Sequence, residues 1–384
     1  MLSLECSKRI PPSHPINFMK APDMLIPIML PANQPPARFY QGGEKIAAFR
    51  SHAFATVGVA ATAAAEEGPN DVAATRLHVP EDWVASVTCL AGDPRLGLTE
   101  LPDGRTLAEA IESDPHGWLG PDHVSTFGTD TKLLVKLLDA GQRLPVHIHP
   151  SAEFAHEHLD RSHGKAEAWY ILQGGIIHFG LKEELSRSTL ERLVATQAVE
   201  ELLPLLHEIE VAAGDTVFVP AGTLHAIGKG VFLVELQEPE DLSILLEWRD
   251  FDLDGERDGH LGLGFDIALD AVDLRASSLA EISSFITRNY VGNSLFVHSA
   301  DEFFQLGRTV VDGAAELAPG FAVVVVIDGD ALLHGADGHI TALPTGSTSV
   351  VPFAAGPLRF SGKADILIAR PPATGPHPAT RLIS

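Results

Sequence analysis

The alternation of apolar and polar positions along the chain predicts a structure built mainly from short β-strands. Leu and Val recur at helical spacing between residues 181 and 209, and Thr106 precedes a second helical pattern as a candidate N-cap. Elsewhere, apolar runs of strand length are closed by Gly, Pro or acidic turns: TKLLVKLLDA, LPVHIHP, AEAWYIL, TVFVP, VFLVELQ and LSILLEW. We therefore expect a mainly β protein with a short helical insert around residues 181–209.

The same patterns divide the chain into three parts. Residues 1–37 are rich in proline and predict a flexible N-terminal leader. Residues 38–285 hold the strand-like runs and the helical insert, and predict one large domain. Residues 286–384 predict a smaller C-terminal β domain, because FAVVVVIDGDALLHG and STSVVPFAAGPLRFSG read as strands separated by glycine turns.

Composition narrows the range of partners. Of the 384 residues, 45% are apolar, which is enough for a sizeable core. The formal net charge of −24 argues against nucleic acid or an anionic membrane as a partner, and no apolar run is long enough to span a bilayer. The two cysteines, Cys6 and Cys89, do not indicate a disulfide framework. We therefore expect a reduced, cytoplasmic setting.

Four side chains around the strand-like runs predict a metal site. His147 and His149 alternate in LPVHIHP, so their imidazoles share one face if this run is extended. Glu167 lies in AEAWYIL, and His225 follows the Pro-x-Gly turn that closes TVFVP. Three imidazoles and one carboxylate on facing strands suit a divalent transition metal. A lone histidine in such a run is usually a satisfied core or surface residue. Three histidines and a glutamate at matching positions instead favour a bound metal.

A second His-x-His pair, His156 and His158, lies in the polar segment SAEFAHEHLDRSHG. This segment predicts a solvated surface loop, which makes a second metal site the weaker interpretation.

The spacing of the metal motifs resembles that of a known family. The segments LPVHIHP, GKAEAWYIL, GDTVFVPAGTLHAIGKG and VELQEPED resemble motifs of the type I mannose-6-phosphate isomerases, within the cupin superfamily. The resemblance runs from about Arg38 to about Pro371. It implies two cupin-type jelly rolls (double-stranded β-helices), the second of them degenerate and without metal. It also implies one divalent metal per chain, which is zinc in the family although iron, manganese or nickel would accept the same ligands, and a monomer or homodimer.

The resemblance further implies an activity and the residues that perform it. The family interconverts mannose 6-phosphate and fructose 6-phosphate through a cis-enediol. The partner that the resemblance implies is therefore a small molecule, a sugar or sugar phosphate. Lys165 matches the active-site lysine of a Lys-x-Glu motif, and Glu235 and Asp241 match acidic positions that would orient a proton relay. Lys136 lies where the family has a lysine near the substrate. From residue type alone, both lysines could instead be solvated strand-edge residues, Glu235 a carboxylate that holds a ligand, and Asp241 a turn cap.

The chain departs from the family pattern at three polar positions. Leu245 stands where the family has an arginine, Pro145 where it usually has a serine, and Phe251 where some members have a lysine. Phosphate recognition depends on charged donors, so an unphosphorylated or differently substituted sugar is a close alternative substrate. Arg249 is a candidate replacement for the missing cation. Two other functions stay open: an iron-dependent cupin oxygenase and a non-catalytic sugar-binding cupin.

Overall fold

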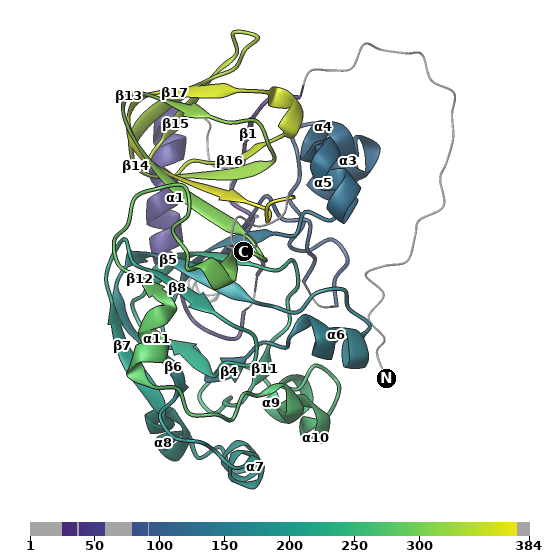
Figure 1. The fold of residues 1–384 in the computed structure, drawn as a ribbon, viewed down its shortest axis with the longest axis vertical. Coiled ribbons are helices and arrows are strands. Elements are labelled where there is room, and N and C mark those ends of the chain that lie inside the picture. Colours follow the sequence, from purple (N-terminus) through teal and green to yellow (C-terminus); the bar gives the residue numbers. More distant parts are fainter. Residues whose placement is uncertain (1–24, 37, 58–78, 91, 375–384) are drawn as a thin grey trace, which may run out of the picture.

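The computed structural model describes residues 25–36, 38–57, 79–90 and 92–374. Its strands form three sheets, two in the lower part of Figure 1 and one at the top. Strands within each sheet pair in an antiparallel manner. The predicted mainly β class is confirmed.

The first sheet has the order β12-β8-β5-β10-β3-β2. Its strands are β2 (Glu81–Val84), β3 (Leu134–Asp139), β5 (Glu167–Gln173), β8 (Thr216–Val219), β10 (Phe232–Gln237) and β12 (Ile286–Thr287). Every residue of β3 and β10 is buried, as their nearly continuous apolar sequences require. The register places Glu235 of β10 directly beside Lys136 of β3, so two charged residues of this buried region are neighbours.

The second sheet has the order β11-β4-β9-β6-β7. Its strands are β4 (His147–Ile148), β6 (Gly175–Leu181), β7 (Leu206–Val211), β9 (His225–Ile227) and β11 (Ile244–Leu245). On β4, His147 pairs with His225 on one side and with Leu245 on the other. This short strand therefore sets the spacing of two of the predicted metal ligands.

The two sheets pack face to face around a shared apolar cluster. Trp169 and Leu233 from the first sheet pack with Phe179 and Ile227 from the second, all at most 1% exposed. Each such side chain contributes roughly 1.5–3 kcal/mol through its burial. Because side chains alternate across each strand, residues beside this cluster also point between the sheets, where the charged residues lie.

The third sheet has the order β1-β16-β14-β17-β13, with β15 paired to β14. Its strands are β1 (Ile28–Met29), β13 (Gln305–Leu317), β14 (Ala322–His334), β15 (Ile340–Pro344), β16 (Thr348–Val351) and β17 (Leu358–Arg370). Strand β12 joins the first sheet, so the chain crosses between the two regions just after the predicted boundary at residue 286.

The N-terminal part corrects the predicted leader. Ile28 pairs with Val350 of β16, and the side-chain amide of Asn33 donates to the carbonyl oxygens of Trp83 and Gly97. The chain therefore enters the fold before residue 38, through long-range pairing that its local sequence does not reveal. Residues 1–24 lie outside the described residues.

Short helices surround the sheets, and α7 and α8 lie at the end away from the third sheet (Figure 1). They are α1 (Glu44–Val57), α3 (Leu107–Ser113), α4 (Pro115–Leu119), α5 (Pro121–Phe127), α6 (Ala152–Leu159), α7 (Arg187–Ala195), α8 (Val199–Leu202), α9 (Gly255–Asp258), α10 (Phe265–Ala268) and α11 (Leu279–Ser284). Thr106 caps α3 in a capping box with Glu109, as its spacing indicates. The helical insert ends earlier than residue 209, because the alternating sequence from Leu206 forms β7.

The loop predicted around His156 and His158 is instead helix α6. Ser151 caps this helix by accepting a hydrogen bond from the Phe154 backbone N–H, and Phe154 and Ala155 are buried. One buried apolar turn stabilises a segment that is polar overall, which is why composition alone suggested a loop.

Two further observations bear on the setting of the protein. Cys89 is disulfide-bonded in the structure, so the expectation of no disulfide is wrong at this residue. The other cysteine, Cys6, lies outside the described residues. No helix among the described residues is long and apolar enough to cross a membrane.

Candidate metal centre and the adjoining pocket

The structure brings His147, His149 and His225 together. One ring nitrogen from each lies within 4.8 Å of the others. The ring centroids are 4.1 Å apart for His147 and His225, and 5.0 Å apart for His149 and His225. All three side chains are buried. The cluster arises because β4 and β9 are neighbours, while His149 continues the chain just past β4.

A backbone carbonyl orients each of the three rings. The Nδ1 atom of each ring lies 2.8 Å from a carbonyl oxygen, that of Pro145 for His147, of Leu242 for His149 and of Thr223 for His225. A carbonyl oxygen can only accept, so each Nδ1 carries the proton and each Nε2 keeps a lone pair. Metal-binding histidines in proteins are held in this way.

Glu167 reaches the cluster from the facing sheet. Its Oε2 lies 2.9 Å from Nε2 of His149, and its Oε1 lies 3.3 Å from Nε2 of His225. Lys165 Nζ donates to Oε2 at 2.7 Å, and the indole N–H of Trp169 donates to Oε1 at 3.0 Å. The carboxylate is therefore fixed in orientation while each oxygen also faces an imidazole nitrogen.

This donor set fits a divalent transition metal. The Nε2 lone pair of His225 faces a carboxylate oxygen, so two acceptors oppose each other, and this buried nitrogen makes no hydrogen bond. Leaving such an atom unsatisfied costs about 1–3 kcal/mol. A cation between the imidazoles and Glu167 would satisfy both groups.

The protonation states agree with metal binding. Burial and the neighbouring imidazoles hold the pKa of His147 well below its ordinary value, and burial together with Lys165 lowers the pKa of His149 to about 4. Burial opposes ionisation of Glu167, but Lys165 and His149 outweigh it and hold the Glu167 pKa well below its ordinary value. Neutral imidazoles and an ionised carboxylate are the forms that coordinate a metal.

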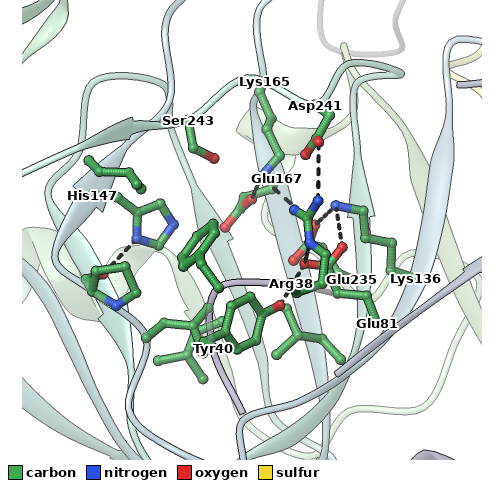
Figure 2. Close-up of a pocket in the computed structure, with 16 residues that line it drawn as sticks. Arg38, Tyr40, Glu81, Lys136, His147, Lys165, Glu167, Glu235, Asp241 and Ser243 are labelled. Carbon is green, nitrogen blue, oxygen red and sulfur yellow. Dashed lines mark hydrogen bonds and ion pairs between the residues drawn. The ribbon is translucent and has the colours of Figure 1, made fainter. Parts of the chain in front are cut away.

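A cavity of about 440 Å³ adjoins the cluster (Figure 2). His147 and Glu167 form part of its wall, so the predicted ligands open onto it. The other lining residues are Arg38, Phe39, Tyr40, Glu81, Lys136, Leu138, Leu144, Pro145, Lys165, Ile227, Glu235, Asp241, Ser243 and Leu245.

The predicted catalytic residues lie on one side of this cavity. The Lys165 ammonium is 3.0 Å from Nε2 of His149 and 3.9 Å from Oε1 of Glu235, and Lys136 approaches the same Glu235 oxygen at 3.5 Å. Burial and the charge of Glu167 raise the pKa of Glu235. Burial lowers the pKa of Lys136, but the carboxylates of Glu81 and Glu235 outweigh it and the pKa is raised. A proton can therefore be held or exchanged next to the metal ligands.

The sequence did not single out a second set of polar residues around Arg38. The Arg38 Nε donates to Glu81 at 3.1 Å, and the Arg38 Nη1 lies 3.5 Å from the Asp241 carboxylate (Figure 2). Glu81 also accepts from the Tyr40 hydroxyl at 2.6 Å and from the Trp83 indole at 2.7 Å. The segment ARFYQGG, which holds Arg38 and Tyr40, could have pointed to these two residues. Nothing in the sequence indicated Glu81.

Arg249 lies away from both the cavity and the histidine cluster. Its side chain is 44% exposed and pairs with Glu200 and Asp250. It does not line the cavity. This position gives no support to the predicted substrate contact. Leu245, which stands at the position of the family arginine, lines the cavity wall instead.

Known proteins resemble the chain in sequence and in fold. No protein-family model matches it. It is 28% identical over 277 residues to the mannose-6-phosphate isomerase ManA of Bacillus subtilis (strain 168), covering 69% of this chain and 82% of that protein. A crystal structure of the mannose 6-phosphate isomerase from Bacillus subtilis has a TM-score of 0.65 at 23% identity, covering 90% of this chain and 100% of that chain. A mannose 6-phosphate isomerase bound with zinc and yttrium has a TM-score of 0.65 at 13% identity, covering 91% of this chain and 100% of that one.

The antiparallel sheets and the buried His–Glu cluster define a mainly β protein with a candidate metal site between two sheets. Together with these similarities, they make the chain similar in sequence and in fold to known mannose-6-phosphate isomerases.

Proposed function

We propose that the protein is a metal-dependent aldose–ketose isomerase that interconverts mannose 6-phosphate and fructose 6-phosphate, or a closely related sugar pair. The observation that carries the proposal is the position of Lys165. Its ammonium lies 2.7 Å from Glu167 and 3.0 Å from His149, beside the cavity. A proton-transfer group and the candidate metal ligands thus share one wall of one pocket. The names of the similar proteins support this class of substrate.

We assign His147, His149, Glu167 and His225 as the ligands of one divalent ion. Zinc is the first choice, because three imidazoles and a carboxylate suit it and a structure of similar fold contains it. The ion would supply Lewis-acid polarisation of the sugar oxygens.

The residues of the chain supply the proton transfer. Isomerisation moves a proton between C1 and C2 of the sugar, so a group is needed that takes the proton and returns it. Lys165 and Glu235 lie 3.9 Å apart on the cavity wall and are the candidates for this exchange. The positive charges of Lys136 and Lys165 favour the negative charge that develops on the enediolate. Asp241 holds the Arg38 guanidinium toward the same wall.

We interpret residues 38–285 as one cupin-type jelly roll and residues 286–384 as a degenerate second one. The shared core of the first two sheets supports the first assignment. Among the described residues, the cluster of three metal-type side chains falls in the first of these regions. Strand β12, at the start of the second region, pairs with β8 of the first, and so links the two regions.

An unphosphorylated sugar is the second candidate substrate, and specific contacts favour it. Leu245 and Pro145 form apolar parts of the cavity wall, at the positions where the family has an arginine and a serine as hydrogen-bond donors. Among the cations that line it, Arg38 pairs with Glu81 and Asp241, and Lys136 with Glu81 and Glu235. Phosphate would have to compete with these carboxylates.

The test compares mannose 6-phosphate with free mannose as substrates of the metal-loaded protein, before and after chelation. We expect ketose formation from at least one of them, its loss on chelation, and its return with zinc. Elemental analysis before the assay identifies the ion. Absence of turnover of both sugars by protein that contains one metal per chain would contradict the proposal.

A further inference from the structure

His163 occupies a buried position in the segment that joins α6 to β5. Its Nε2 lies 2.7 Å from Oδ2 of Asp130, and its side chain is 11% exposed. Asp130 precedes β3, the strand that carries Lys136, and His163 comes just before Lys165 in the chain. The ion pair therefore connects two segments that each lead into a strand bearing a site residue.

Other charged groups around this pair reinforce it. Glu240, in the connection after β10, places Oε1 3.9 Å from Nδ1 of His163, and Arg161 lies 3.9 Å from the other Glu240 oxygen. Lys132 donates its backbone N–H to Asp130 at 2.8 Å and brings its ammonium within 3.6 Å. Burial lowers the pKa of His163, but the hydrogen bond to Asp130 and the nearby Glu240 carboxylate outweigh it and raise the pKa to about 9. His163 is therefore a cation at neutral pH.

The backbone that follows His163 is held closely on two sides. The backbone N–H of Lys165 donates to the Pro150 carbonyl at 3.0 Å, and that of Ala166 donates to the Glu238 carboxylate at 2.9 Å. At Gly164, an added Cβ would lie 2.5 Å from the Pro150 oxygen, so only glycine permits this approach. Pro150 directly follows His149, and Glu238 follows the strand of Glu235.

We propose that the His163–Asp130 ion pair is a positioning device for Lys165. Its part in catalysis rests on the proposed function, whereas the geometric role does not. The backbone contacts fix the origin of the lysine side chain, and the ion pair holds the segment against the β3 side of the site. Without the pair, the segment keeps its contacts to Pro150 and Glu238 but loses its link to β3. Displacement of a reacting group by about 1 Å can cost roughly 100-fold in rate.

The test uses His163→Gln and Asp130→Asn, with His156→Gln as the matched control. His156 is an exposed histidine of α6, the helix just before His163. We expect kcat to fall roughly 10- to 100-fold in both test variants, with metal content unchanged and KM altered less than about twofold. The His156→Gln protein should match the wild type.

A charge-retaining variant separates positioning from simple packing. We expect His163→Arg to recover most of kcat, because arginine keeps the cation opposite Asp130. The wild-type kcat should fall as the pH rises through about 9, because His163 then loses its charge. The same fall should be seen in His156→Gln and be absent in His163→Arg. If His163→Gln does not fold, Asp130→Asn carries the same comparison. Unchanged kcat and an unchanged pH profile in folded, metal-loaded variants would overturn the proposal.

A second measurement needs no turnover. Lys165 contacts both His149 and Glu167, so a displaced ammonium changes the field at a metal held by them. In cobalt(II)-loaded protein, we expect the visible absorption bands of His163→Gln to differ from those of the wild type and of His156→Gln. Identical bands in all three proteins would overturn the positioning role. If the wild type isomerised no sugar but the bands shifted, the proposed function would fail while the positioning role stood.

Discussion

His147 and His225 are register partners on the antiparallel strands β4 and β9, and their ring centroids lie 4.1 Å apart. Each donates its Nδ1 proton to a carbonyl oxygen two residues earlier in the chain, at Pro145 and Thr223. Both Nε2 atoms are therefore free of protons and point into the space near Glu167. Burial and the neighbouring imidazoles hold the pKa of His147 well below its ordinary value.

The first prediction concerns the metal. His225→Asn should weaken metal binding at least 10- to 100-fold, because it removes one imidazole from the cluster. Elemental analysis after gel filtration should then find little metal in the variant. His178→Asn is the matched control, since His178 is a buried histidine on the adjacent strand β6. Equal metal content in the His225 variant and the wild type would remove His225 from the ligand set.

The second prediction concerns proton transfer. Lys165→Met should lower kcat by roughly 10²- to 10⁴-fold, because a methionine can neither exchange a proton nor stabilise an enediolate. Metal content should stay near that of the wild type, since Lys165 is not among the proposed ligands. Lys182→Met serves as control, because the Lys182 ammonium donates to the Pro204 carbonyl at an exposed position and does not line the cavity. A kcat within threefold of the wild type would exclude Lys165 from the chemistry.

The third prediction concerns the substrate. Leu245→Arg places a cation on the cavity wall where the wild type has an apolar side chain. We expect the ratio of kcat/KM for mannose 6-phosphate to that for mannose to rise about tenfold, which corresponds to ~1.4 kcal/mol. Leu245→Met controls for the change of packing. A ratio that does not move in the arginine variant would show that this wall does not face the phosphate.

The fourth prediction is a pH dependence of stability. The pKa of His163 is about 9 in the folded protein against 6.5 for an ordinary histidine, and folding therefore favours the protonated form. The resulting stabilisation is fully present below pH 6.5 and is lost as the pH rises through about 9. Its size is on the order of 3 kcal/mol. Urea unfolding of the wild type should show this loss between these pH values.

Asp130→Asn should remove most of that pH dependence, because the carboxylate is the main partner of His163. Asp122→Asn, at an exposed position of α5, should leave it intact. If the free energy of unfolding depended on pH in the same way in the wild type and in Asp130→Asn, the assignment of the ion pair would be contradicted.

The fifth prediction concerns the Arg38 network. Tyr40→Phe removes the hydroxyl that donates to Glu81 at 2.6 Å. Hydrogen bonds to charged groups contribute about 1.5–3 kcal/mol, so we expect the free energy of unfolding to fall by that amount. Tyr290→Phe is the control, because Tyr290 is 52% exposed. A loss below about 0.5 kcal/mol would show that the remaining donors to Glu81 compensate.

Local sequence was sufficient for several elements of the fold and site. Strand alternation in LPVHIHP put His147 and His149 on one face, since that periodicity depends on neighbouring residues only. Thr106, as the candidate N-cap, likewise predicted the start of α3. Polar helix α6 was missed because Phe154 and Ala155 stabilise it by packing, and packing is not visible in composition.

Contacts between distant segments decided the rest. Arg249 lies four residues after Leu245, yet its guanidinium pairs with Glu200 at the surface, whereas Leu245 lines the cavity. Arg38, Glu81 and Asp241 are far apart in the chain and meet only because the folded chain brings their segments to one cavity.

By itself, the sequence determined which residues alternate toward the core and which of them carry metal-binding chemistry, because both depend on spacing of a few residues. Only the tertiary structure decided that Glu167 faces His225 across two sheets, that Leu245 forms the cavity wall, and that His163 holds Asp130 beside Lys165. Such pairings depend on sheet order and loop packing, which are set by the burial of the whole apolar core and not by any single stretch of the chain.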